Sequence, residues 1–136
     1  MKQIDVTRFN EIVQEGLPVA ADAGIHLKCF DGEFAEVVMP YHENTLRPGG
    51  TISGPHMMLI ADVCMFAVVL GAIGEVKLAV TTNLNINFLR KPGASDLVAR
   101  GKALKMGKRL AVIDVSIFSD GDLVAHATGT YSIPPR

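Results

Sequence analysis

The sequence predicts an α+β domain in which one antiparallel β-sheet packs against one long, buried helix. Two observations carry this prediction. The run from Pro55 to Leu70 is almost wholly apolar, and runs of alternating polarity stand on both sides of it. Since 136 residues are enough for one core, we expect residues 1–136 to form a single domain.

The composition excludes several classes of protein. Hydrophobic residues make up 49% of the chain, which is typical of a folded globular domain and not of a disordered one. A net charge of -1 gives no general attraction for nucleic acid. The N-terminus lacks the apolar core of a signal peptide, and Cys29 and Cys64 have no CxxC spacing. We therefore expect buried free thiols and a reducing, cytoplasmic location.

The first part of the chain predicts a short helix and a hairpin. Residues 5–16 carry apolar side chains at helical spacing, and residues 17–24 form a turn or a single helical turn. Residues 25–40 alternate in polarity around Asp31-Gly32, which predicts two paired strands. The loop over residues 41–54 is long for a small domain, and such loops are often functional.

The long helix is expected to begin at Ser53 or Gly54 and to end at Gly71 or Gly74. Its length raises the question of a membrane span, but Asp62 would then lie near the bilayer centre, which favours a helix in a soluble core. Because one sheet is not expected to cover an apolar helix on all sides, we expect a homodimer whose second subunit covers the rest.

Three strands are counted after the helix, although four runs read as strands: residues 77–90, 110–119 and 123–133, and a weaker strand over residues 97–106. Regular alternation in the first run defines two faces. One face carries Thr82, Leu84, Ile86 and Phe88, and the other carries Thr81, Asn83, Asn85 and Asn87.

Asp62 is the main candidate for chemistry. A buried carboxylate must be paired, hydrogen-bonded or protonated, because an unpartnered buried charge is strongly destabilising. No lysine or arginine lies within a helical turn of it. Such a carboxylate suits a general base or a nucleophile. The structural alternative is an aspartate that bonds backbone amides and holds a dimer in register.

Gly54 is the second candidate. The first turn of a helix presents unpaired N–H groups and the positive end of the helix dipole, and glycine lets a ligand approach the backbone. Because Pro55 has no N–H, the donor of an oxyanion hole would be Gly54, with His56 as a possible second. A helix cap without a ligand is the alternative.

Other residue types give weaker signals. No histidine pair has metal-ligand spacing and no glycine-rich nucleotide motif is present, so we expect neither a metal nor a cofactor. Basic residues gather at two turns, Arg90-Lys91 and Lys108-Arg109, and Arg47 lies in the long loop. They can hold the phosphates of a charged ligand or be solvated turn charges.

Three segments resemble the PaaI-like (phenylacetyl-CoA thioesterase-like) group of acyl-CoA thioesterases: "LRPGGTISGPHMMLIAD", "VTTNLNINFLRKP" and "GKRLAVIDVSIFS…GDLVAHATGTYSI". The resemblance implies a hotdog fold, an antiparallel β-sheet wrapped around a long central helix with a short N-terminal helix. The family pattern has an Asn, a loop, His-Gly-Gly, and an Asp nine residues after that His. Here Ser53-Gly54-Pro55 stands where His-Gly-Gly would be.

The resemblance also implies a role for each matching residue. Asp62 would be the nucleophile or the base that activates water, and Gly54 would hold the thioester oxygen. Asn44 would help to bind the carbonyl or the water, and Thr81 would orient the water. In such enzymes the site lies at the dimer interface, so Asp62 and Thr81 of one subunit would face Asn44 and Gly54 of the other, in a homodimer or a homotetramer.

The sequence departs from the family pattern in two places. The imidazole is lost at Ser53 or moved to His56, and the loop after Asn44 is longer than usual, which makes Asn83 an alternative to Asn44. The remaining residues expected to contact the substrate are Ser53, His56, Met58, Arg90, Lys91, Lys108 and Arg109.

The function expected from these observations is hydrolysis of a small or medium acyl- or aryl-CoA thioester. One alternative is a non-catalytic module that binds or senses acyl-CoA, which the missing His-Gly-Gly motivates. Another is a dehydratase of hydroxyacyl thioesters, which needs an acid–histidine pair. His56 is poorly placed for that pair, because it lies about 120° round the helix from Asp62.

Overall fold

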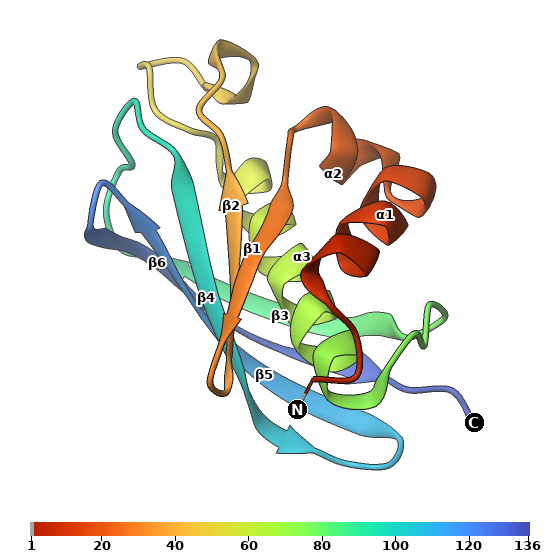
Figure 1. Ribbon diagram of the computed structural model, residues 1–136. Helices are drawn as coiled ribbons and strands as arrows, with labels where there is room; N and C mark the ends of the chain where they lie inside the picture. The colour runs from red at the N-terminus through yellow and green to blue at the C-terminus, as the bar shows by residue number, and fades with distance from the viewer. Residues whose placement is uncertain (1) are drawn as a thin grey trace.

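In the computed structural model, which describes residues 2–136, one antiparallel sheet curls around a long central helix (Figure 1). This confirms the predicted fold class. The sheet has the strand order β1-β2-β4-β5-β6-β3. The strands are β1 (His26–Asp31), β2 (Phe34–Met39), β3 (Val80–Phe88), β4 (Leu97–Met106), β5 (Leu110–Ser119) and β6 (Asp122–Ser132). The helices are α1 (Val6–Gly16), α2 (Pro18–Asp22) and α3 (Gly54–Ile73), with a 3-10 turn η1 (Glu43–Thr45) in the long loop.

Four strands follow α3, so the count of three is wrong, although the weaker strand expected over residues 97–106 is formed. The additional strand is β4, which lies between β2 and β5 in the sheet. Its pattern in the sequence is weak because a bulge between Ala103 and Lys105 interrupts the alternation. Its burial also changes along its length, from buried Leu97 to Leu104, which is 56% exposed.

Helix α3 has the caps that its sequence predicts. The Ser53 side chain accepts a hydrogen bond from the His56 amide at the start, and Gly74, at φ +93°, provides the left-handed residue that ends the helix. Among the described residues α3 is the one helix long and apolar enough to span a membrane. However, 67% of its apolar window is buried inside the fold, so it is the core helix.

The sheet covers α3 on most sides but not on all of them. The sheet curves around the helix, and α1 covers a further side, where the Phe9 ring lies 5.8 Å from that of Phe66 (Figure 1). What stays open is a strip that carries Met58, Leu59 and Asp62. This strip lies between α2 and β3, and β3 is an edge strand.

The two cysteines are free thiols. Cys64 is buried as expected, whereas Cys29 is only partly buried, so the expectation of burial is wrong there. Burial raises the pKa of both thiols, and Glu36 adds to the rise. The raised pKa favours the protonated thiol over the thiolate at both cysteines, which argues against a role as nucleophile.

Candidate active site

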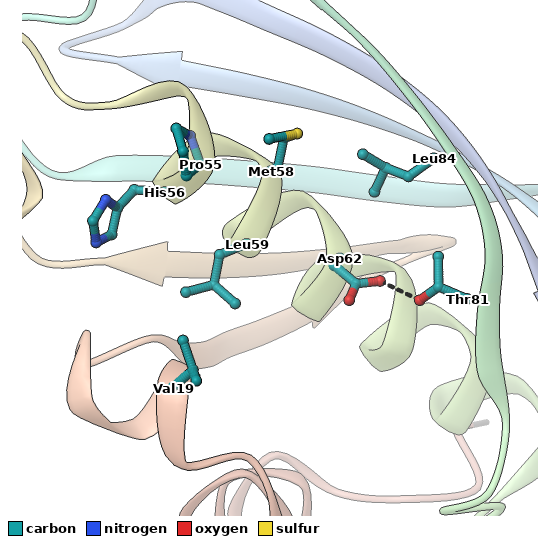
Figure 2. Close-up of a pocket in the computed structure, with 8 residues that line it drawn as sticks. All are labelled: Val19, Pro55, His56, Met58, Leu59, Asp62, Thr81 and Leu84. Atoms are coloured by element: carbon teal, nitrogen blue, oxygen red, sulfur yellow. Dashed lines mark hydrogen bonds between the residues drawn. The ribbon is translucent and has the colours of Figure 1, made fainter. Parts of the chain in front are cut away.

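Asp62 lies in the open strip of α3, where Figure 2 shows its hydrogen bond with Thr81. Two hydroxyl groups, those of Thr81 and Tyr131, hold one of its oxygens. Thr81 donates from Oγ1 to Oδ1 at 2.6 Å, and Tyr131 donates from its hydroxyl to the same Oδ1 at 2.7 Å. Within residues 2–136, Oδ2 receives no hydrogen bond. The carboxylate therefore has the hydrogen-bond partners that its burial requires, and they are two hydroxyl groups, not backbone amides. Its second oxygen, Oδ2, is left for a ligand.

A bulge in β3 brings Thr81 to this position. Thr81 and Asn83 lie opposite Tyr131 and Thr130, which are consecutive in β6, so Thr82 is an extra residue. One extra residue exchanges the faces of the strand beyond it. The predicted alternation is therefore wrong here: Thr81 faces α3, and Asn83 lies on the opposite face of the sheet. Asn83 cannot replace Asn44 in the site of its own subunit.

Two adjoining cavities open at Asp62. The first, of about 500 Å³, runs along α3 toward its start and is lined by Val19, Pro55, His56, Met58, Leu59, Thr81 and Leu84 (Figure 2). The second, of about 450 Å³, lies beside α2 and is lined by Leu17, Val63, Phe66, Ala79 and Tyr131, with Asp62 and Lys77 as its charged residues. Both linings are mainly apolar, which suits an acyl group. Met58, which we expected to contact the substrate, lines the first cavity.

Tyr131 is the site residue that sequence analysis missed. It is 3% exposed, and its hydroxyl also lies 3.0 Å from the Asp62 carbonyl oxygen. Burial, and secondarily the charge of Asp62, raises the pKa of this hydroxyl above its usual range, so it stays protonated and donates. One signal was present: Tyr131 continues a buried face of β6 otherwise made of small residues, Ala125, Ala127 and Gly129.

One amide at the start of α3 is left for a ligand. The Ser53 side-chain oxygen accepts a hydrogen bond from the His56 amide at 3.3 Å, and the Ser53 carbonyl oxygen accepts one from the Met57 amide at 3.2 Å. Pro55 has no N–H, so the amide of Gly54 is the one without a partner among the described residues. Gly54 lines a separate cavity of about 410 Å³, and a Cβ at this position would lie 3.3 Å from the Phe88 ring.

The two basic turns lie far apart. Arg90 and Lys91 line the Gly54 cavity, as does Arg47. Arg90 lies near the Ser119 end of β5, where it forms an ion pair with Asp122. Lys108 and Arg109 lie in the turn before Leu110, at the opposite end of the strand. At 3.3 Å per residue, the length of β5 separates the two turns by about 30 Å. In one subunit, the two turns therefore cannot hold the same ligand group, and only the first one adjoins the candidate site.

Gly54 and Asp62 do not meet within one subunit. Eight residues separate them along α3, which corresponds to about 12 Å at 1.5 Å per residue. That is too far for one thioester carbonyl to contact both. Asn44 is exposed in η1 and lines a fourth cavity, with His42, His56 and others, so one subunit does not bring it to Gly54 either.

His56 lies beside the start of α3, and its Nδ1 is 2.6 Å from Ser53 Oγ. The ring does not pair with Asp62, whose partners are Thr81 and Tyr131. The acid–histidine pair that a dehydratase needs is therefore not formed between these two residues. In residues 2–136, no group of three or more His, Cys, Asp or Glu side chains is arranged to hold a metal ion.

Comparison with known proteins identifies the family. A family model described as "Thioesterase superfamily" matches residues 49–126. A relative from Thermoplasma acidophilum, named a "putative esterase", is 33% identical over 99 residues, which are 72% of this chain and 74% of the relative. A solved structure from Silicibacter sp. TM1040, described as a "putative thioesterase", shares 37% identity at a TM-score of 0.88 and covers 99% of this chain and 95% of its own.

A further solved structure shows the same fold at lower identity. The E. coli PaaI protein from the phenylacetic acid degradation operon has a TM-score of 0.78 and 24% identity, over 96% of this chain and 94% of its own. The matched residues include the start of α3 with Gly54, and also Asp62 and its partner Thr81 in β3. The chain belongs to the Thioesterase superfamily and is a thioester hydrolase with the hotdog fold.

Proposed function

We propose that the protein hydrolyses a small or medium acyl- or aryl-CoA thioester, at a site that two subunits form together. The observation that carries this proposal is the carboxylate of Asp62. Its Oδ1 is held by two hydroxyl groups, and its Oδ2 is free beside two apolar cavities. A carboxylate held in this way suits attack on a carbonyl or the activation of water.

The second half of the site is the Gly54 amide of the partner subunit. As the thioester carbonyl becomes tetrahedral, its oxygen gains negative charge, and an N–H at a helix start stabilises that charge. One such donor contributes about 2.7–4 kcal/mol to the stabilisation of the transition state. The intermediate then collapses, the carbon–sulfur bond breaks, and the thiol of CoA leaves.

Asp62 can act in either of two ways. As a nucleophile, Oδ2 forms an anhydride with the acyl group, which water then hydrolyses. As a base, it takes a proton from the attacking water and passes it to the leaving sulfur. Thr81 serves both routes, because its hydroxyl donates to Asp62 and keeps lone pairs that can accept a hydrogen bond from the water.

The edge strand β3 supports the assembly that this site requires. Its edge is free, and it carries exposed apolar side chains: Val80 is 56% exposed and Phe88 51%, and Leu89, directly after the strand, is 56% exposed. Such an edge is normally covered. Two copies paired antiparallel through β3 would be related by a two-fold axis, with the Phe88 end of one against the Thr81 end of the other. Since Phe88 lies beside Gly54, this pairing brings Gly54 of one subunit to Asp62 of its partner.

The charges beside Gly54 support CoA as the carrier. Arg47, Arg90 and Lys91 line the Gly54 cavity, where the phosphates of CoA would lie once the carbonyl is at Gly54. The acyl group would then enter the apolar cavities at Asp62 and Tyr131. The name of the PaaI neighbour supports an aryl acyl group as one candidate. The two free thiols support a cytoplasmic location.

The test compares two carriers of the same acyl group. Thiol release is measured for short, medium and aryl acyl-CoAs and for the matching N-acetylcysteamine thioesters, which lack the phosphates. We expect turnover of at least one acyl-CoA, and we expect the double variant Arg90→Ala/Lys91→Ala to raise KM for it about tenfold. The KM for the short thioester should not change.

The double variant Lys108→Ala/Arg109→Ala is the matched control, since it removes the same charge at the far end of β5. Equal effects of the two double variants would count against a phosphate site at Gly54. Tight binding of acyl-CoA with no turnover of any substrate would instead support the binding module.

A further inference from the structure

The hydroxyl of Tyr131 takes part in no step of the proposed reaction, although it contacts Asp62 twice. It donates to Asp62 Oδ1 at 2.7 Å and lies 3.0 Å from the Asp62 carbonyl oxygen, so it contacts both the side chain and the backbone of this residue. Thr81 donates to the same Oδ1 at 2.6 Å. Two donors on one oxygen fix the rotation of the carboxylate more firmly than either one alone.

The two donors form a directly opposed pair in the sheet. Thr81 of β3 is the residue opposite Tyr131 of β6, and the bulge follows immediately after it. The carboxylate therefore rests on a cross-strand pair whose spacing the backbone hydrogen bonds fix. The Tyr131 ring is itself held by burial and by stacking on Phe66, with ring centroids 6.3 Å apart and planes inclined by 24°.

Tyr131 is suited to donate a hydrogen bond and not to transfer a proton. Burial and the neighbouring carboxylate both raise the pKa of its hydroxyl above the usual range, which opposes loss of the proton. It also lies on the Oδ1 side of Asp62, whereas Oδ2 is the oxygen without a partner. The effect of the hydroxyl on catalysis is therefore expected to pass through Asp62, while the ring lines the acyl cavity.

We propose that Tyr131 is a positioning residue, which together with Thr81 immobilises Oδ1 of Asp62 and so makes Oδ2 the oxygen that reacts. This rests on Asp62 being the reacting carboxylate of the proposed function, but it does not depend on CoA as the carrier. Tyr131 is then also the point at which the acyl cavity beside α2 meets the catalytic carboxylate.

The test uses Tyr131→Phe, which keeps the buried ring and removes only the hydroxyl. With an N-acetylcysteamine thioester that the wild type hydrolyses, we expect kcat to fall about 10–100-fold and KM to change less than twofold. The control is Thr130→Val, which removes a hydroxyl from the adjacent residue on the other face of β6. It should keep the wild-type kcat.

Two further measurements extend the test, and the first keeps the proposal open to refutation if Tyr131→Phe folds poorly. Thr81→Val removes the other donor from an exposed position and should lower kcat similarly, whereas Thr81→Ser keeps the hydroxyl and should restore it. A crystal structure of Tyr131→Phe should show Asp62 in more than one orientation. Wild-type kcat in Tyr131→Phe, or a single unchanged Asp62 orientation, would overturn the positioning role. If Arg90→Ala/Lys91→Ala left KM for acyl-CoA unchanged, that result would count only against CoA as the carrier and not against the positioning role.

Discussion

Replacement of Asp62 by Asn is expected to lower kcat about 10²–10⁴-fold, the range for loss of a positioned acid or base. The amide is nearly isosteric with the carboxylate, and its oxygen can still accept from Thr81 and Tyr131. The fold should therefore survive, while the negative oxygen that attacks or takes the proton is lost. Initial rates of thiol release at saturating substrate measure the effect, with thermal unfolding as a check on folding.

The matched control for this change is Asp114→Asn. Asp114 is also a half-buried, hydrogen-bonded carboxylate, but its partner is His126 and it lies in β5, away from α3's open strip. We expect near wild-type kcat for this variant. Full activity of Asp62→Asn would show that Asp62 has a structural role only, as an aspartate that holds an interface in register would have.

Replacement of Gly54 by Pro is expected to lower kcat about 10²–10³-fold, because it removes the one amide that the start of α3 leaves for the thioester oxygen. Proline suits the first turn of a helix, where its missing N–H breaks no intrahelical bond. The preceding residue, Ser53, has φ -69° and ψ 151°, which a residue before proline readily adopts. The measurement is kcat on the substrate that the wild type prefers.

Gly54→Ala separates the lost N–H from added bulk. A Cβ at this position would lie 3.3 Å from the Phe88 ring, so a small shift of an exposed ring accommodates it, and the amide remains. We expect a loss of kcat well below that of the proline variant. Equal losses in the two variants would show that the contact with Phe88 matters and that the hydrogen bond does not.

Much of the fold and the core of the site could be predicted from the sequence, because they depend on local patterns. A lone carboxylate in an apolar helix identifies Asp62, and Gly-Pro after a serine identifies the start of α3. The sheet follows from alternation, except at β4, where a bulge breaks the pattern. These features need only the chemistry of neighbouring residues.

The remaining features depend on contacts between distant segments. Thr81 seemed to face away from Leu84 because alternation assumes a regular strand, and the bulge at Thr82 reverses it. Tyr131 lies 69 residues from Asp62, and only the pairing of β6 with β3 brings its hydroxyl there. The curvature of the sheet, which covers most of α3, is likewise a property of all six strands together.

The central claim is that Asp62 of one subunit and Gly54 of its partner form one site, and co-refolding two inactive variants tests it most directly. A heterodimer of Asp62→Asn and Gly54→Pro subunits has one site with both substitutions and one site with neither. Random pairing of equal amounts makes half of the dimers heterodimers, so we predict recovery of about a quarter of the wild-type activity. If the mixture stays at the mean of the two variants, both residues act within one subunit and the shared site is wrong.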